Sequence, residues 1–297
     1  RYNKAFKRDS QRVAFLLCVG FCDYSVMRKL SSSVGCPLTR RYTIGVYMEK
    51  KTINEYYDEF IQKVADISLM QRVVDDAFKR EMKVLMEYEF KERSSDIIRH
   101  DALGYHNLFT GKLEKYAFRK TTVSDLIRMT FIHKNTQYCW LMASAFECFE
   151  KFIKHVYLYA SNNNEVHKLC LRKILSFISD NNGNIKRYEK NNTSGIHLKV
   201  AVLFIEKLRH AIVHAQGFIG SEVNELVSKI FKESGVVNDG NRNVHEDFIK
   251  QYIKDRHIIL VEVPIETQGR LPLYHNTYTH LVSYLIGYAG LVNKYIE

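Results

Sequence analysis

The sequence predicts an all-α protein. Of its 297 residues, only 3 are proline and 14 are glycine, fewer turn-forming residues than a β-sandwich or a propeller requires. Hydrophobic residues make up 46% of the chain and aromatic residues 12%, which is enough for a packed core and excludes a wholly disordered protein. Along most of the chain the apolar residues recur at intervals of three and four, the period of a helix. The length fits one large domain or two small ones.

The first part of the chain, residues 1–134, is predicted to be a basic helical region. Ser10 is placed to cap a helix that runs to about Leu30, and either Thr52 or Asn54 is placed to cap the next one. This second helix continues as a long amphipathic segment. We expect its apolar stripe to pack against another helix of the same core: Met70, Val73, Val74, Ala77, Val84, Leu85 and Tyr88.

Two polar stretches interrupt the helical pattern. Residues 94–107 are mostly polar and contain Gly104, which favours a loop. A second break is expected around the polar residues 133–136, and we place a domain boundary there, between residues 134 and 135.

The second part, residues 135–297, is predicted to be a unit of four or five helices with a small β-hairpin near the C-terminus. Asn162–Asn164 end its first helix, the polar residues 180–195 form a loop, and Gly217 is placed to end the third helix. The expected helices are Leu141–Tyr159, Glu165–Ile178, Ile196–Ala215, Glu222–Phe231 and Asn276 to the end, and the expected strands are Ile258–Val263 and Arg270–Tyr274.

Positive charge is concentrated near the N-terminus. The chain carries a net charge of +11, and residues 1–48 alone hold nine Lys or Arg against two Asp. Residues 135–297 hold 19 basic and 16 acidic residues, a near balance. The basic segment is either a solvated face or the footprint of a nucleic acid, and in the second case Arg8, Arg12, Arg40 and Arg41 are the candidate RNA-binding residues.

The composition also bears on compartment and cofactors. Six cysteines lie among apolar residues at helical spacing, which favours buried reduced thiols over disulfides. A basic start followed by the ten apolar residues 13–22 has the outline of a signal peptide, but no small-residue cleavage site follows, and the run is too short to span a membrane. We therefore expect a cytoplasmic protein that does not enter the membrane. The chain starts at Arg1, which leaves open whether residues precede it.

One short motif carries a chemical prediction. Arg209 and His214 form an R-x4-H pattern in the segment LRHAIVHAQG, residues 208–217, late in a predicted helix. This motif resembles the signature of the HEPN superfamily. The segment SAFECFEKF, residues 144–152, resembles the first long helix of many HEPN domains. The resemblance covers about residues 135–297 and implies a HEPN-like helical bundle.

The resemblance implies a metal-independent endoribonuclease, of the kind found as toxins or as abortive-infection effectors against phage. The expected products are a 2′,3′-cyclic phosphate and a 5′-hydroxyl end. The residue types fit this chemistry, because His214 can move protons near neutral pH and Arg209 can hold the phosphate oxygens. His210 fills a position where many family members carry a polar residue, and it is expected to orient or contact the phosphate. Glu147 or Glu150 is expected to orient Arg209 from the first helix of the unit.

Helix geometry adds a constraint to this site. Five residues of an ideal helix turn through about 500°, so that Arg209 and His214 point about 140° apart. Either the helix is distorted there or the site gathers groups from two chains. HEPN domains resemble the second case, which implies a homodimer with a composite site. An antitoxin or inhibitor, protein or RNA, is a further partner that the resemblance implies.

Other interpretations of the chain remain open. The sequence contains no P-loop, no G-x-G-x-x-G, no G-x-S-x-G and no cysteine pair of redox type, and its histidines lack the spacing of a metal site. We therefore expect neither a cofactor nor a metal. The main alternative is a non-catalytic HEPN-like module that binds RNA or a partner protein. A third is a monomeric helical scaffold that is unrelated to HEPN.

Overall fold

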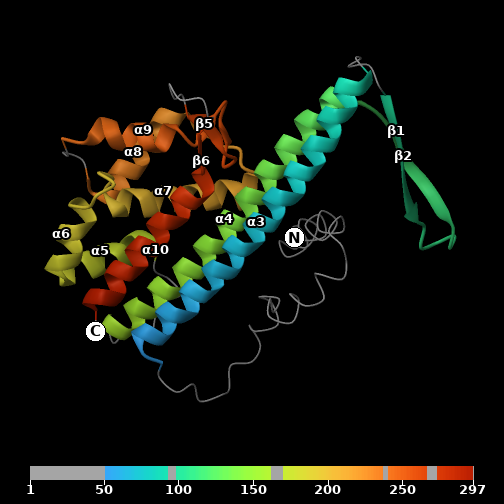
Figure 1. Cartoon of the computed structure of the whole chain (residues 1–297). Coiled ribbons are helices and arrows are strands. Elements are labelled where there is room, and N and C mark those ends of the chain that lie inside the picture. The colour runs from blue at the N-terminus through green and yellow to red at the C-terminus, as the bar shows by residue number, and fades with distance from the viewer. Residues whose placement is uncertain (1–50, 93–97, 162–169, 237–239, 266–272, 297) are drawn as a thin grey trace. The chain divides into compact units, whose positions relative to one another are not determined.

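The computed structural model describes residues 51–92, 98–161, 170–236, 240–265 and 273–296 (Figure 1). These residues form eight helices and three two-stranded antiparallel sheets, so the prediction of a mostly helical protein is confirmed. The predicted helix from Ser10 to Leu30 and the four arginines chosen for RNA binding, Arg8, Arg12, Arg40 and Arg41, lie outside the described residues. Residues 52–297 form one compact unit.

Two long antiparallel helices lie side by side in this unit (Figure 1). Helix α3 (Ile53–Glu92) begins as predicted after Thr52, whose hydroxyl accepts a hydrogen bond from the Glu55 amide at 3.2 Å while the Glu55 carboxylate accepts one from the Thr52 amide at 2.7 Å. This reciprocal pair is a capping box. Helix α4 (Val123–Ser161) packs against α3 through aromatic side chains, with Phe60 of α3 lying on Phe149 and Phe152.

The predicted apolar stripe of α3 is only partly the buried one. Leu85 is buried, whereas Val73 and Val84 are 55% and 48% exposed. The line that faces α4 is shifted by about one residue and passes through Gln71 and Asp75, both buried. Since these two positions are polar, the pattern of apolar residues could not locate the buried face.

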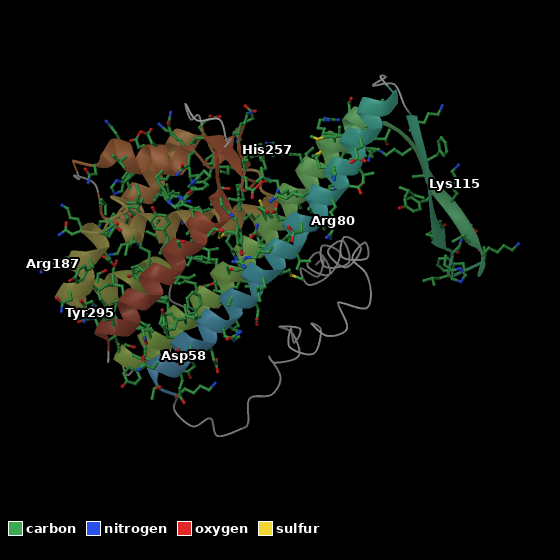
Figure 2. The ribbon with its side chains drawn as sticks, in the orientation of Figure 1. Asp58, Arg80, Lys115, Arg187, His257 and Tyr295 are labelled. Carbon is green, nitrogen blue, oxygen red and sulfur yellow. The ribbon has the colours of Figure 1, made fainter. Side chains whose placement is uncertain are left out.

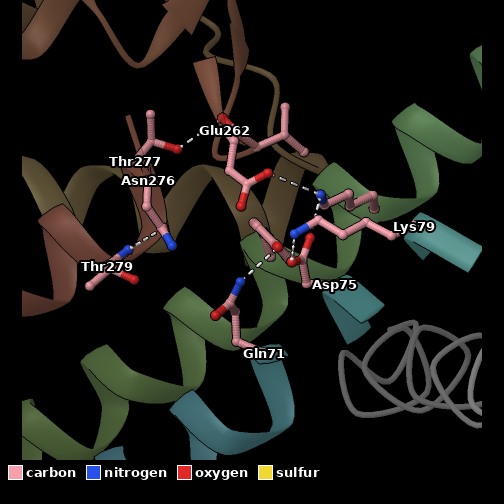
Figure 3. A network of polar contacts seen from close by, with 10 residues as sticks. Gln71, Asp75, Lys79, Glu262, Asn276, Thr277 and Thr279 are labelled. Carbon is pink, nitrogen blue, oxygen red and sulfur yellow. Dashed lines mark hydrogen bonds and ion pairs between the residues drawn. The ribbon is translucent and has the colours of Figure 1, made fainter. Parts of the chain in front are cut away.

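A polar network replaces apolar packing at this point of the α3–α4 contact (Figure 3). Gln71 Nε2 donates to the Tyr138 hydroxyl at 2.6 Å. The Asp75 carboxylate accepts from Lys79 of its own helix at 2.5 Å and from Lys134 of α4 at 2.6 Å. Lys134 also lies 3.6 Å from the Glu262 carboxylate, so the network links both long helices to the segment before α10 (Thr277–Tyr295).

The two expected breaks in the N-terminal region are corrected by the structure. Residues 133–136 lie inside α4, which runs through them without interruption. Asn135 donates to the Ile258 carbonyl at 2.7 Å and accepts from the Leu260 amide at 2.7 Å, so this stretch is tied to the later part of the chain. The expected boundary between residues 134 and 135 therefore does not divide the structure, because α4 is continuous there and Lys134 and Asn135 contact other parts of the chain.

The stretch expected as a loop contributes instead to a β-hairpin. Strand β1 (Ile98–His106) pairs antiparallel with β2 (Leu113–Thr122). The turn between them is closed by Asn107, whose side-chain oxygen accepts from the Phe109 and Thr110 amides at 2.9 and 3.3 Å, and by Gly111 with a φ of 65°. Asn107 is a turn residue that bonds to the turn backbone, and the strands have no regular alternation of polar and apolar residues. Both features explain why the sequence of this segment favoured a loop.

The remaining helices surround α7 (Leu198–Ala215), whose residues 200–205 are all buried. It contacts α4, α10 (Thr277–Tyr295), α8 (Val223–Ser234), α5 (Leu171–Asn181) and α6 (Gly183–Lys190). Helix α9 (Arg242–Lys250) packs on α8. The described part of residues 135–297 thus has more helices than the four or five expected.

Helices α6 and α9 were not predicted because they are short and mainly polar. Helix α6 lies inside the expected loop 180–195 and is anchored by a buried carboxylate. Glu189 accepts from the Ser179 hydroxyl at 2.5 Å and from the Tyr288 hydroxyl at 2.8 Å. Only Ile185 and Glu189 of α6 are buried, and a buried pair of which one member is a carboxylate leaves no apolar period in the sequence.

A hairpin is present near the C-terminus, as predicted, but with other bounds. Strand β5 (Val263–Ile265) pairs with β6 (Leu273–His275), whereas Ile258 belongs to a separate pair, β3 (Ile253–Lys254) with β4 (His257–Ile258). The cysteines of the described part, Cys139, Cys148 and Cys170, are free thiols. A search of the described helices finds none with the length and apolar character that crossing a membrane requires.

Candidate active site

The R-x4-H motif occupies the last two turns of α7. The helix begins after His197, whose ring nitrogen accepts from the Lys199 amide at 3.3 Å, and it ends where Gln216 and Gly217 take left-handed φ values of 53° and 83°. The Ile258 amide donates to the Gly217 carbonyl at 3.0 Å. Ala211 and Ile212, which lie between Arg209 and His214, are buried and hold the end of the helix against the core. His210 and His214 are exposed.

Arg209 is directed toward α4. Its Nη2 donates to Glu147 Oε1 at 3.0 Å, and its Nε is buried without a hydrogen-bond partner. The side chain of Glu147 is 52% exposed and that of Arg209 is 28% exposed. Glu150, the other acid expected to orient Arg209, is paired instead with Lys154 of its own helix at 2.7 Å. The structure therefore distinguishes the two candidate acids.

His210 and His214 lie together on the exposed side of α7. Their ring centroids are 4.6 Å apart. Partial burial of the ring lowers the pKa of His210, and the nearby charges of His214, Arg209 and Lys207 lower it further. His210 is thus held as a neutral imidazole at pH 7, a form that accepts a proton.

An acidic residue that the sequence motif does not include lies one helical turn before this pair. Glu206 precedes His210 by four residues, one helical turn. Burial raises its pKa, the carboxylates of Glu233 and Glu150 raise it further, and Lys207 opposes the shift. Lys207 lies 3.5 Å from Glu206 and 2.6 Å from Glu233 of α8. Glu206, His210 and His214 follow one another at intervals of four, a spacing that places them on one face of the helix. The same spacing also fits an ordinary solvated face, so the sequence alone did not single out Glu206.

The structure joins some of the predicted site residues and not others. It brings Arg209 to Glu147 and His210 to His214, while no hydrogen bond or ion pair between Arg209 and His214 is found in the described part of the chain. Helix α7 is continuous through the motif, so distortion of the helix does not bring these two side chains together. Of the two geometric solutions expected, a distorted helix is therefore wrong.

The described residues contain no group of three or more His, Cys, Asp or Glu side chains arranged to hold a metal ion. Comparison with known proteins adds no family: no protein-family model, no curated protein and no solved structure matches the chain.

Proposed function

We propose that the protein is a metal-independent endoribonuclease with Arg209, His210 and His214 as its catalytic residues. The observation that supports this most is the pair of imidazoles 4.6 Å apart beside Arg209, on the exposed side of α7. Two proton-transfer groups and one permanent cation are what cleavage of RNA without a metal requires. The resemblance of the motif to HEPN domains points to the same reaction.

The roles follow from the surroundings of each side chain. His210, kept neutral by its environment, takes the proton of the ribose 2′-hydroxyl as the 2′-oxygen attacks phosphorus. His214 donates a proton to the 5′-oxygen as the bond from phosphorus to that oxygen breaks. Arg209 stabilises the charge that builds up on the non-bridging oxygens. The products are a 2′,3′-cyclic phosphate and a 5′-hydroxyl.

Arg209 is positioned by Glu147, and it acts together with histidines of a second chain. The guanidinium has five N–H donors, so the single bond from Nη2 to Glu147 leaves others of the fork for phosphate oxygens. Because Arg209 and His214 diverge on a straight helix, we propose a homodimer in which Arg209 of one chain faces His214 of the other. A toxin or anti-phage role is the cellular setting that we propose from the resemblance alone.

The test is cleavage of single-stranded RNA by the purified protein in excess EDTA. Arg209→Ala and His214→Ala should each remove cutting, with an unchanged circular dichroism spectrum and melting temperature. Substrates with 2′-deoxyribose at the cut site should not be cleaved, because they lack the attacking oxygen. If both variants cut as fast as the parent, this assignment of the catalytic residues is wrong.

A second candidate function is a non-catalytic module that binds RNA or a partner protein. The Arg209–Glu147 ion pair favours it, because an arginine engaged across two helices can serve structure alone. In that case the parent binds RNA or a partner without cutting, and Arg209→Ala lowers the melting temperature instead of an activity.

A further inference from the structure

The hairpin β1–β2 exposes more apolar side chains than any other element of the described structure. Among the described residues, seventeen large hydrophobic ones are exposed, and seven of these belong to the hairpin: Leu103, Tyr105, Leu108, Phe109, Leu113, Tyr116 and Phe118. A two-stranded hairpin buries little by itself and is marginally stable alone. These side chains therefore do not form a core, and their exposure calls for a partner surface.

The aromatic rings are distributed along the ribbon. Tyr105 and Tyr116 meet edge to face with centroids 6.2 Å apart. Tyr116 is the extra residue of a bulge, since Leu103 pairs with Ala117 and Gly104 with Lys115. Phe118 follows two residues later, 51% exposed, with the Lys115 ammonium 4.5 Å from its ring centroid. Rings and cations thus alternate over the length of the strand and not at its tip alone.

The charge of the hairpin is positive. Residues 102–122 contain four cations, Lys112, Lys115, Arg119 and Lys120, against one carboxylate, Glu114, a net charge of +3. Glu114 is engaged within the hairpin, because it accepts hydrogen bonds from Asn107, Thr110 and Tyr105, and these bonds lower its pKa. Lys115 lies on the hairpin (Figure 2), where its ammonium sits over the Phe118 ring.

We propose that the β1–β2 hairpin binds a single-stranded nucleic acid, with its bases stacked on Phe118 and Tyr116 and its phosphates near Lys112, Lys115 and Lys120. Exposed rings interleaved with cations are how proteins hold single strands without reading their sequence. An anionic membrane would also attract the cations, and the exposed Leu108, Phe109 and Leu113 at the turn fit insertion of the tip. Insertion of the tip would leave the strand rings Tyr105, Tyr116 and Phe118 uncovered, whereas a polymer lying along the ribbon covers them together with the neighbouring cations, and this favours the polymer.

This surface is separate from the α7 motif and does not depend on cleavage. The experiment uses the full chain and a short fluorescent RNA that carries 2′-O-methyl groups, which 2′-hydroxyl attack cannot cut. Phe118→Ala should weaken binding by about five- to 150-fold, the range for loss of one stacked base. The matched control is Phe131→Ala on α4, which removes a ring of the same 51% exposure and should leave the affinity unchanged.

Salt dependence gives a second, independent measurement. The logarithm of the association constant should fall as the logarithm of the salt concentration rises. Changing Lys112, Lys115 and Lys120 to Gln should make this fall less steep, by about 0.7 for each phosphate that the hairpin no longer neutralises. Circular dichroism and the melting temperature of each variant show whether the fold is kept.

The outcomes separate the alternatives. Equal affinities for Phe118→Ala and Phe131→Ala, or no binding of the oligonucleotide by the parent, would overturn the proposal. Binding of the parent to phosphatidylserine vesicles but not to the oligonucleotide would assign the hairpin to a membrane surface instead. If Phe118→Ala loses the oligonucleotide while no RNA is ever cut, the hairpin proposal stands and the proposed nuclease function falls.

Discussion

At the scale of single residues, Glu147 and Glu150 show how position decides the role of a side chain. Both lie on α4, both are acidic, and both were candidates to orient Arg209. Glu147 lies 3.0 Å from Arg209 across the helix contact, while Glu150 bonds to Lys154 within its own helix. The two residues therefore form a matched pair for testing whether Arg209 must be positioned.

Glu147→Gln should lower the rate constant for RNA cleavage by about ten- to a hundredfold, because a displaced guanidinium no longer matches the transition state. Its effect on the free energy of unfolding should stay below about 1 kcal/mol, since the pair is partly exposed. Glu150→Gln should leave cleavage unchanged. Single-turnover kinetics and urea unfolding measure the two effects, and Glu147→Asp should restore part of the rate if the carboxylate acts by positioning. Equal losses in both Gln variants would contradict this role.

His210 is expected to titrate below the ordinary histidine pKa. Partial burial contributes most to this lowering, followed by the charge of His214. His214→Gln should therefore raise the pKa of His210 without restoring it fully. The pH titration of the His210 ring proton signals by NMR measures this change, and an unchanged midpoint would mean that the two rings do not interact.

The lowered pKa of His210 makes the free energy of unfolding depend on pH. Because the folded state binds this proton less well than the unfolded state, the unfolded state gains protons first as the pH falls through the ordinary histidine value. Above that pH the ring is neutral in both states, and as the pH falls from the unfolded pKa to the lower folded pKa the free energy of unfolding decreases.

At the scale of elements, the contact between α3 and α4 depends on ionic pairs in its middle. Burial alone would raise the pKa of Asp75, but hydrogen bonds from Lys134 and Lys79 outweigh it and hold the pKa below its ordinary value. The side chains of Asp75 and Lys134 are both 12% exposed. A charge left alone at such a position is costly.

Asp75→Asn should lower the free energy of unfolding by about 2–3 kcal/mol, because Lys134 keeps only the more distant Glu262. Asp76→Asn, an exposed neighbour, should change it by less than about 0.5 kcal/mol. Urea unfolding followed by the fluorescence of Trp140, the single tryptophan of the chain, measures both. A similar, small effect of the two variants would show that the network adds no stability.

The pH dependence of this network has a defined sign. Since the pKa of Asp75 is lower in the folded state, its contribution is present above its unfolded value, near 3.8, and is lost as the pH falls through the folded value. The stability of the parent should therefore fall more steeply below about pH 4 than that of Asp75→Asn.

At the scale of the whole molecule, the composite site predicts complementation between inactive chains. Unfolding and refolding a mixture of Arg209→Ala and His214→Ala chains produces mixed dimers. Each mixed dimer holds one site with an intact Arg209 and an intact His214, so the mixture should recover about a quarter of the parent's activity. Light scattering measures the dimer, and cleavage in EDTA measures the recovery. A dimer that recovers no activity would place both residues of each site on one chain.

The missed and displaced elements show which signals the sequence contains. Helix starts at Thr52 and Asn276 were predictable, because a cap bonds to an amide three residues away. Helix α6 was not, because its anchor Glu189 meets Tyr288 across 99 residues. The hairpin was missed because its side chains are exposed on both faces, which leaves no alternation of apolar and polar residues.

Local sequence was sufficient to predict the helical class, Thr52 as one of two candidate caps of α3, the start of α10, and the position of the R-x4-H motif at the end of α7. All of these depend on residues within about one turn of each other, where spacing along the chain equals proximity in space. The folded chain was needed to show that Glu147, 62 residues away, meets Arg209, and that polar Gln71 and Asp75 face α4. Those contacts depend on the register of one helix against another, which long-range packing sets and a local pattern does not contain.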